Sequence, residues 1–225
     1  MRFDVVTIFP TMFGSVFAQG VVGRALREER IELHAHDLRD YALDQRHRQV
    51  DDAPFGGGAG MVLMAEPIQL AVDRIRGDNR GPVLITEPWG EPLSQELVRE
   101  LAREPGLIIV CGRYEGVDDR VREALGAREI SIGSYILSGG ELPGMVLIDA
   151  VSRLQPGVLG DERSLDQDAL GVEPGGYPQY TRPARWRDRA VPDALLSGDH
   201  AAIARWRRTH ARAPQAMGPA PHVRN

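Results

Sequence analysis

Four short apolar runs, separated by helical patterns, constrain the fold of this chain more than any other feature. The runs are rich in Val, Ile or Leu, which is typical of buried strands, and they cover residues 3–8, 82–86, 107–110 and 129–132. Helical patterns occupy residues 94–103, 117–125 and 141–154. Strands that alternate with helices predict an α/β domain built around a mostly parallel sheet.

The pattern changes after the segment Gly157-Val158-Leu159-Gly160. The residues that follow are polar and turn-rich, as in a linker or a mobile active-site segment. Helical patterns return at residues 192–196 and 199–212. We therefore expect an α/β domain over residues 1–160, a flexible linker over residues 161–176 and a small helical domain over residues 177–225.

Charge is distributed unevenly along the chain, whose formal net charge is −5. From Arg182 to Asn225 there are nine Arg, three Asp and no Glu, a net charge of about +6, which leaves about −11 for the first 181 residues. Such asymmetry is typical of a segment that binds a polyanion such as a nucleic acid. A solvated helical face is an equally good explanation of the charge alone.

Several classes of protein and site are excluded. No run of about 18 apolar residues occurs, and the start MRFDVVTIFP lacks the pattern of an export signal, so we expect no membrane span and a cytoplasmic protein. Cys111 is the only cysteine, which excludes an internal disulfide. A Walker phosphate loop is excluded because the chain has no Lys. No metal-ligand spacing is visible, so no residue is assigned to a metal.

Three glycine-containing segments are candidates for ligand contacts. Residues 50–61, VDDAPFGGGAGM, suit either a loop that contacts a nucleotide or a plain flexible hairpin. Residues 111–120, CGRYEGVDDR, and 131–141, SIGSYILSGGE, each follow an expected strand and precede an expected helix. In open α/β sheets ligands bind at that edge, where exposed backbone groups can hold an adenine or a ribose. Cys111 itself is more typical of a core residue than of a nucleophile.

Single charged residues have both functional and plain structural interpretations. Arg153 lies four residues after Asp149, the spacing of an ordinary surface pair on a helix. Asp168 is one of several acids between residues 161 and 173, and composition does not choose among them. Beyond residue 176, Arg interleaved with Tyr and Trp suits RNA binding, and the same Trp residues suit a small core.

The order of the motifs is far more specific than any one of them. FDVVTIFP, VDDAPFGGGAGM, CGRYEGVDDRV, SIGSYILSGGE, RLQPGVLG, PQYTRP, LLSGDHA and RWRR occur in the order found in bacterial tRNA (guanine-37, N1)-methyltransferases. The chain closely resembles this family from about residue 1 to residue 208. The resemblance implies a methyltransferase of the SPOUT class, with a deep trefoil knot in its α/β domain, that works as an obligate homodimer on tRNA.

The resemblance also implies the cofactor and the site residues. The methyl donor would be S-adenosylmethionine, and Mg²⁺ is an expectation that rests on the family alone. The catalytic residues would be Asp168 as the general base and Arg153 as its assistant, contributed by opposite subunits. The donor pocket would contain Gly112, Glu115, Ile132, Gly133, Ser134, Tyr135, Ile136, Leu137 and Gly140. The tRNA contacts would include Arg182, His200, Arg205, Arg207 and Arg208.

This chemistry suits the residue types. Guanine N1 carries a proton, which a carboxylate can remove while a fixed guanidinium stabilises the charge that spreads to O6. The chain departs from the family pattern at three places: Ser134 replaces the usual Asp, Glu87-Pro88-Trp89-Gly90 replaces a typical Ser-Pro-Gln-Gly, and Ala169-Leu170 replaces Ser-Phe. The alternatives are a related knotted RNA 2′-O-methyltransferase and an RNA-binding homologue without activity.

Overall fold

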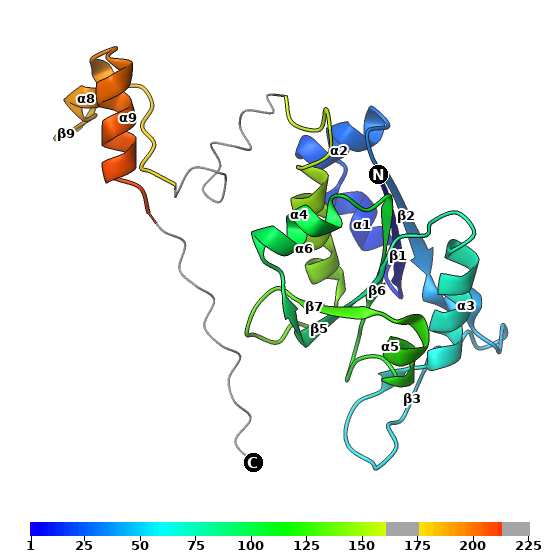
Figure 1. Cartoon of the computed structure of the whole chain (residues 1–225). Coiled ribbons are helices and arrows are strands. Elements are labelled where there is room, and N and C mark those ends of the chain that lie inside the picture. The colour runs from blue at the N-terminus through cyan, green and yellow to red at the C-terminus, as the bar shows by residue number, and fades with distance from the viewer. Residues whose placement is uncertain (161–175, 213–225) are drawn as a thin grey trace. The chain divides into compact units, whose positions relative to one another are not determined.

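The computed structural model describes residues 1–160 and 176–212 (Figure 1). These residues belong to two compact units, one formed by residues 1–160 and one by residues 176–212. Within these described ranges, no helix is both long enough and apolar enough to span a membrane. The candidate base Asp168, most of the expected linker and the end of the chain lie outside the described residues.

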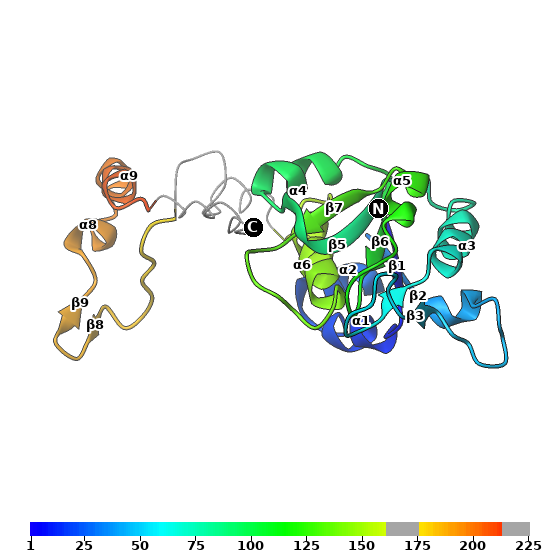
Figure 2. The ribbon, with the colours of Figure 1, turned by 90° about the horizontal axis from the view of Figure 1, so that it is seen from below.

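A five-stranded sheet forms the centre of the larger unit, and every neighbouring pair of its strands is parallel. The strands are β1 (Arg2–Thr7), β2 (Glu32–Asp37), β5 (Val83–Pro92), β6 (Gly106–Cys111) and β7 (Arg128–Ser131), and they lie in the order β2-β1-β6-β5-β7. This confirms the prediction of an α/β fold with a mostly parallel sheet. Parallel strands are joined by crossover connections, so both faces are covered by helices (Figure 2).

Two apolar cores lie on the two faces of this sheet. On β6, Leu107, Ile109 and Cys111 enter one core while Ile108 and Val110 enter the other, because successive side chains of a strand point to opposite faces. The first core is completed by α1 (Thr11–Val16), α2 (Gly20–Arg27), α4 (Gln95–Leu101) and α6 (Glu141–Ser152). The second is completed by η1 (Leu38–Tyr41), α3 (Ala65–Ile75) and α5 (Arg120–Leu125). Cys111 is buried, as expected of a core cysteine.

Three elements differ from the sequence expectation. Strand β2 is not anticipated, because it lies at the sheet edge and its sequence ELHAHD has no apolar run. Helix α5 begins at Arg120 rather than at residue 117, because Val117 instead forms a parallel bridge with Leu63. Strand β5 continues to Pro92, with a break in its register against β7 between Thr86 and Glu91. The glycine-rich segment connects β3 (Asp51–Asp52) to β4 (Val62–Leu63), which pair as an antiparallel hairpin.

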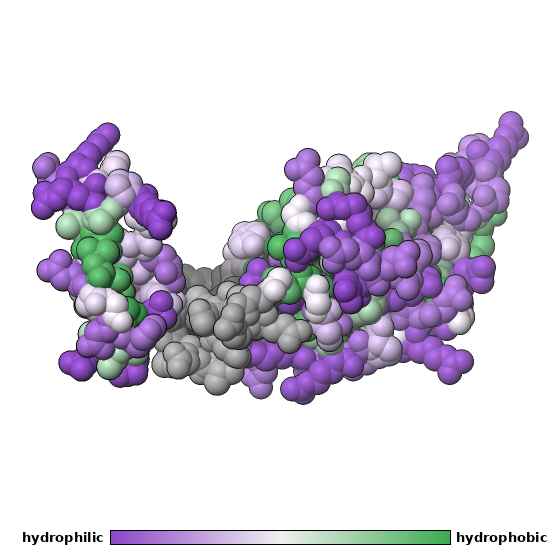
Figure 3. All heavy atoms as spheres, turned by 90° about the horizontal axis from the view of Figure 1, so that it is seen from above, coloured by the Kyte–Doolittle hydropathy of each residue, from purple (hydrophilic) through white to green (hydrophobic). Residues whose placement is uncertain are grey.

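The smaller unit contains a short hairpin and two helices. They are β8 (Arg185–Trp186), β9 (Arg189–Ala190), α8 (Asp193–Leu196) and α9 (His200–Thr209). Asp199 caps α9 by accepting hydrogen bonds from the backbone N–H groups of Ala201 and Ala202. Trp206 stacks on His210 with 4.2 Å between ring centroids, whereas Trp186 is exposed beside the Arg187 guanidinium. On the face shown in Figure 3, hydrophobic residues form patches among mostly hydrophilic ones.

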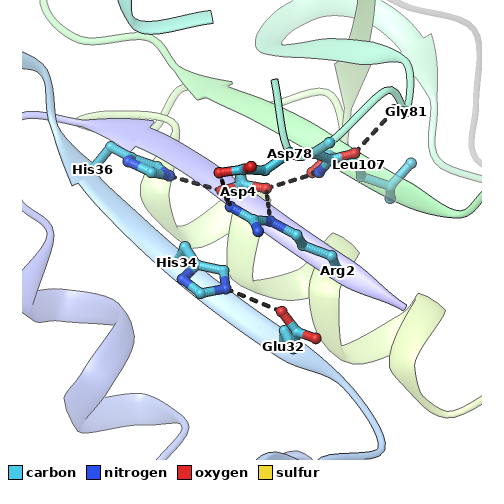
Figure 4. Close-up of polar contacts among 9 residues, drawn as sticks. Arg2, Asp4, Glu32, His34, His36, Asp78, Gly81 and Leu107 are labelled. Carbon is cyan, nitrogen blue, oxygen red and sulfur yellow. Dashed lines mark hydrogen bonds and ion pairs between the residues drawn. The ribbon is translucent and has the colours of Figure 1, made fainter. Parts of the chain in front are cut away.

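A buried polar cluster joins the central sheet to the segment that leads into β5 (Figure 4). The carboxylate of Asp4 is fully buried and accepts hydrogen bonds from Arg2 Nε at 2.7 Å, His36 Nε2 at 2.8 Å and Asn79 Nδ2 at 2.8 Å. Asn79 also donates to the Leu107 carbonyl. Burial alone would raise the pKa of Asp4, but the bonds from these three donors together hold that pKa well below its usual range.

We expect Asp4→Ala to lower the free energy of unfolding by roughly 3 kcal/mol, because it removes the buried acceptor that Arg2, His36 and Asn79 share. Since the pKa of Asp4 is lower in the folded chain, its contribution is complete above about pH 4 and is lost as the pH falls below that value. Urea denaturation at pH 7 and pH 3 measures both effects. The control Glu28→Ala, which removes only an exposed pair with Arg24, should change little.

Candidate active site

A pocket opens at the carboxyl edge of the parallel sheet, where β6 and β7 end and β5 stops pairing with β6. Ligand sites of open α/β sheets lie at this edge. The structure brings together eight of the nine residues assigned to the donor pocket by resemblance: Gly112, Glu115, Ile132, Gly133, Tyr135, Ile136, Leu137 and Gly140 all line it. Ser134 lies in the same loop but does not line the pocket.

An ion pair connects the two loops that form this pocket. Arg113 Nε lies 2.8 Å from Glu141 Oε2, and the Glu141 carboxylate is 1% exposed. The other oxygen of Glu141 accepts a hydrogen bond from Thr7 Oγ1 at 2.8 Å. Because Glu141 begins α6, its negative charge also lies favourably at the amino end of that helix. The pair therefore joins the loop after β6, the end of β1 and the start of α6.

Arg113 makes two further contacts that hold it in place. Its Nη1 donates to the Ser138 carbonyl at 2.9 Å, and its guanidinium lies 4.6 Å from the centre of the Phe9 ring. Sequence reasoning assigned no role to Arg113 or Glu141, although both stand inside the motifs CGRYEG and SGGE. In each motif the charged residue directly follows a glycine, which was the available signal. Only the fold brings Arg113 and Glu141 together.

The glycines at 139 and 140 allow the two loops to touch through their backbones. Gly139 forms an antiparallel bridge with Arg113, and the Gly140 N–H donates to the Gly112 carbonyl at 2.8 Å. A Cβ on Gly140 would lie 1.8 Å from Thr86 Oγ1 and 2.9 Å from the Cys111 Cα. Gly140 has φ −81°, so space, and not backbone conformation, requires glycine here.

The pocket surface combines exposed aromatic rings with a constrained backbone. Tyr114 adopts φ +59°, a conformation that non-glycine residues rarely adopt and that often marks ligand sites. The side chains of Tyr114, Tyr135 and Ile136 are each more than half exposed where they line the pocket. An apolar surface with backbone polar groups suits a planar heterocycle and its ribose.

Glu87 places a buried carboxyl group in the pocket. It follows the last residue of β5 that pairs with β6, just where the register of β5 breaks. Its side chain lies against Gly112 and Gly116. Burial, with a smaller effect from the nearby Glu129 carboxylate, raises the pKa of Glu87 to about 7, while a hydrogen bond from the Val117 N–H opposes the rise.

A second cavity lies beside the glycine-rich hairpin. Phe55 is fully exposed at its edge, and Glu115 lines both this cavity and the first pocket. Gly60 packs against Glu115 so closely that a Cβ there would lie 2.5 Å from Glu115 Oε1. The glycine-rich segment therefore belongs to a hairpin, one of the two forms expected from its sequence. The same hairpin lines the second cavity, which is a candidate ligand site.

The structure does not bring Arg153 to the pocket of its own chain. Arg153 directly follows the last residue of α6, whereas Gly140 and the pocket lie at its first residue. A helix of 12 residues is about 18 Å long. The catalytic assignment of Arg153 therefore requires a pocket other than the one at the start of its own α6.

The residues assigned to tRNA binding all lie exposed in the smaller unit: Arg182, His200, Arg205, Arg207 and Arg208. Arg207 also lies over the Tyr177 ring, 4.9 Å from its centre. Sequence reasoning missed the hairpin β8–β9, which presents Arg185, Arg187 and Arg189 beside the exposed Trp186. The alternating sequence RWRDR was the available signal.

Within residues 1–160 and 176–212, no three His, Cys, Asp or Glu side chains gather in a way that could hold a metal ion. We therefore assign no residue to Mg²⁺.

Comparison with known proteins gives consistent matches over almost the whole chain. Residues 1–217 match the family model described as tRNA (Guanine-1)-methyltransferase TrmD. The tRNA (guanine-N(1)-)-methyltransferase of Chloroflexus aggregans is 52% identical over 211 residues, which cover 93% of this chain and 82% of the relative. That of Moorella thermoacetica is 52% identical over 214 residues, 94% and 85% of the two chains. A crystal structure of tRNA (m1G37) methyltransferase from Aquifex aeolicus superimposes with a TM-score of 0.77 at 45% identity, covering 93% of this chain and 88% of that one.

We expect Gly140→Ala to destabilise the larger unit by roughly 1–3 kcal/mol, because the new methyl group overlaps Thr86 and separates the two pocket loops. Chemical denaturation measures the change. Gly14→Ala is the matched control, since it lies inside α1 with open space around its Cβ position and should be neutral or stabilising. Equal stability of the two variants would show that the loops do not need this close contact.

Proposed function

Because the chain belongs to the tRNA (guanine-1)-methyltransferase family, we propose that it transfers a methyl group from S-adenosylmethionine to N1 of guanine 37 in tRNA. The observation that carries this proposal is the pocket at the carboxyl edge of the sheet, built from the two glycine-containing loops that the family motifs mark. We further propose that the backbone of this domain forms the trefoil knot of the family. The knot is proposed on the family resemblance.

The pocket residues fit an adenosine ligand. Ile132, Ile136 and Leu137 supply apolar surface, and Gly112 and Gly133 leave backbone polar groups accessible beside it. S-adenosylmethionine supplies an electrophilic methyl group on its sulfonium. Glu115 lies where this pocket meets the cavity beside the hairpin. Two adjoining sites suit a transfer between a donor and a base, because the reacting atoms must be held close together.

The acid–base chemistry is assigned to Asp168 and Arg153, by resemblance to the family pattern. A carboxylate within hydrogen-bond reach of guanine N1 takes its proton. A guanidinium then stabilises the negative charge that develops on O6. Asp168 lies outside the described residues, so its role rests on its place in the motif order.

We propose a homodimer, and the position of Arg153 supports it. Because α6 separates Arg153 from the pocket at its start, a complete site takes this arginine from a second copy of the chain. The exposed basic residues of the smaller unit, Arg205 and Arg208 among them, are proposed to contact tRNA phosphates, since cations that neutralise phosphates dominate nucleic-acid affinity. Such an enzyme would act in the cytoplasm, where its tRNA substrate is found.

We expect the purified chain to methylate a tRNA transcript that carries guanine at position 37 and to leave the matched adenine-37 transcript unmodified. Only guanine presents a ring N1–H beside an O6 that can hold the developing charge. Nucleoside mass spectrometry identifies the product and separates N1-methylguanosine from 2′-O-methylguanosine. Formation of the 2′-O-methyl product, or of no methylated nucleoside, would contradict the proposal.

We expect Asp168→Asn and Arg153→Ala each to lose most methyl transfer, because each removes one partner from every site. Mixing the two variants and allowing their subunits to exchange should restore activity to about a quarter of the wild-type value, since half the dimers are mixed and each mixed dimer has one intact site. Each variant mixed with itself is the control. A mixture as inactive as its components would contradict a site shared between subunits.

A further inference from the structure

Glu87 is a buried carboxyl group in the donor pocket that the proposed reaction does not use. Its residue is 7% exposed, and its side chain lines the pocket together with Gly112 and Gly116. Oε1 of Glu87 lies 3.1 Å from the Cβ position of each of these glycines, so any larger residue at either place would press on the carboxyl group. The two glycines therefore keep room for a carboxyl group at this place in the pocket.

The charged groups around Glu87 leave the pocket acidic. From β7, Glu129 faces it and raises its pKa, and Glu129 is itself near Arg122 at 4.0 Å and Trp89 Nε1 at 3.4 Å. The loop after β6 contributes Glu115, Tyr114 and Arg113, and the loop after β7 contributes Tyr135. Among the described residues that line the pocket, Arg113 is the only basic one, and it is paired with Glu141.

The two ligands of a methyl-transfer pocket differ in charge. S-adenosylmethionine carries a sulfonium, an ammonium and a carboxylate, a net charge of +1. When the methyl group leaves with the positive charge of the sulfonium, S-adenosylhomocysteine remains as a neutral thioether with a net charge of 0. An ionised carboxylate in a pocket of low dielectric interacts far more strongly with the first ligand than with the second.

We propose that Glu87 makes this pocket select the cationic methyl donor over the neutral thioether product. The inference rests on the proposed function. It adds Glu87 as a residue that sets the ligand specificity of the pocket. Its effect is to favour replacement of product by donor after each turnover. Because the interaction is electrostatic, it does not require Glu87 to touch the sulfonium.

The selectivity depends on the ionisation of Glu87. Because burial raises the pKa of Glu87 to about 7, the group is mostly neutral at pH 6 and mostly ionised at pH 8. A bound cation favours the ionised form, so the affinity for the donor increases as the pH rises through 7. The affinity for the neutral product lacks this increase. A pKa lowered by one unit on donor binding corresponds to an affinity increase of about tenfold above that pKa.

The test is isothermal titration calorimetry of the full chain with S-adenosylmethionine and S-adenosylhomocysteine at pH 6, 7 and 8. We expect the ratio of the two dissociation constants, product over donor, to rise about fivefold from pH 6 to pH 8 in the wild type, because this interval covers only part of the titration. At pH 7, titration in two buffers of different ionisation enthalpy should detect protons released on donor binding. Glu87→Gln keeps the shape of the side chain. It should lose the part of the rise in the ratio, and the part of the proton release, that come from Glu87.

Two further variants separate this role from a structural one. Glu87→Ser introduces a small uncharged side chain, so it remains informative if the glutamine variant folds poorly, and it should behave like Glu87→Gln. Glu129→Gln should shift the midpoint of the rise in this ratio to lower pH, because it removes a charge that raises the pKa of Glu87. The preference for the donor over the product at pH 8 should remain. The ligands' own amino groups titrate in every variant alike and cancel in the comparison.

The outcomes are distinguishable from failure of the proposed function. A wild-type rise that persists unchanged in both Glu87 variants would overturn the inference while methyl transfer to guanine 37 continues. A wild-type chain that binds neither ligand at any pH would overturn the proposed function itself. A purely structural role for Glu87 would lower both affinities together and leave their ratio independent of this residue, which also contradicts the inference.

Discussion

The ion pair between Arg113 and Glu141 holds the pocket of this protein together. Further contacts hold both side chains in place. Glu141 is buried and also accepts a hydrogen bond from Thr7, and the Arg113 guanidinium lies over the Phe9 ring. Breaking a buried pair leaves an uncompensated charge, which is costly. The loop after β6 and the start of α6 are therefore fixed relative to each other, and the pocket between them keeps its shape.

Close backbone contact is the second condition on which the pocket depends. The hydrogen bond from Gly140 to Gly112 brings two chain segments to a distance that no side chain at position 140 permits. Such contact leaves backbone groups as the recognition surface for a ligand. Charged side chains then contribute electrostatics at the edge of this surface, and Glu87 and Glu115 are the acids that line it.

The proposed activity uses residues from several separate parts of the chain. The α/β unit contains the pocket that we propose for the methyl donor, Arg153 lies at the opposite end of α6, and the smaller unit carries exposed Arg residues. Under the proposed activity, a complete site takes groups from a second copy of the chain and from a bound tRNA. A separation of this kind limits methyl transfer to the correct complex, because no single part contains all the groups that the reaction needs.

The sequence by itself determined the parallel α/β architecture, because buried parallel strands appear as apolar runs such as residues 107–110. The order of its motifs also identified the family and the segments that line the pocket. It did not reveal the edge strand β2, whose residues are polar, or the start of α5, which a bridge between Leu63 and Val117 delays. Only the tertiary structure paired Arg113 with Glu141, buried Glu87 and separated Arg153 from the pocket, because these depend on distances between segments remote in sequence.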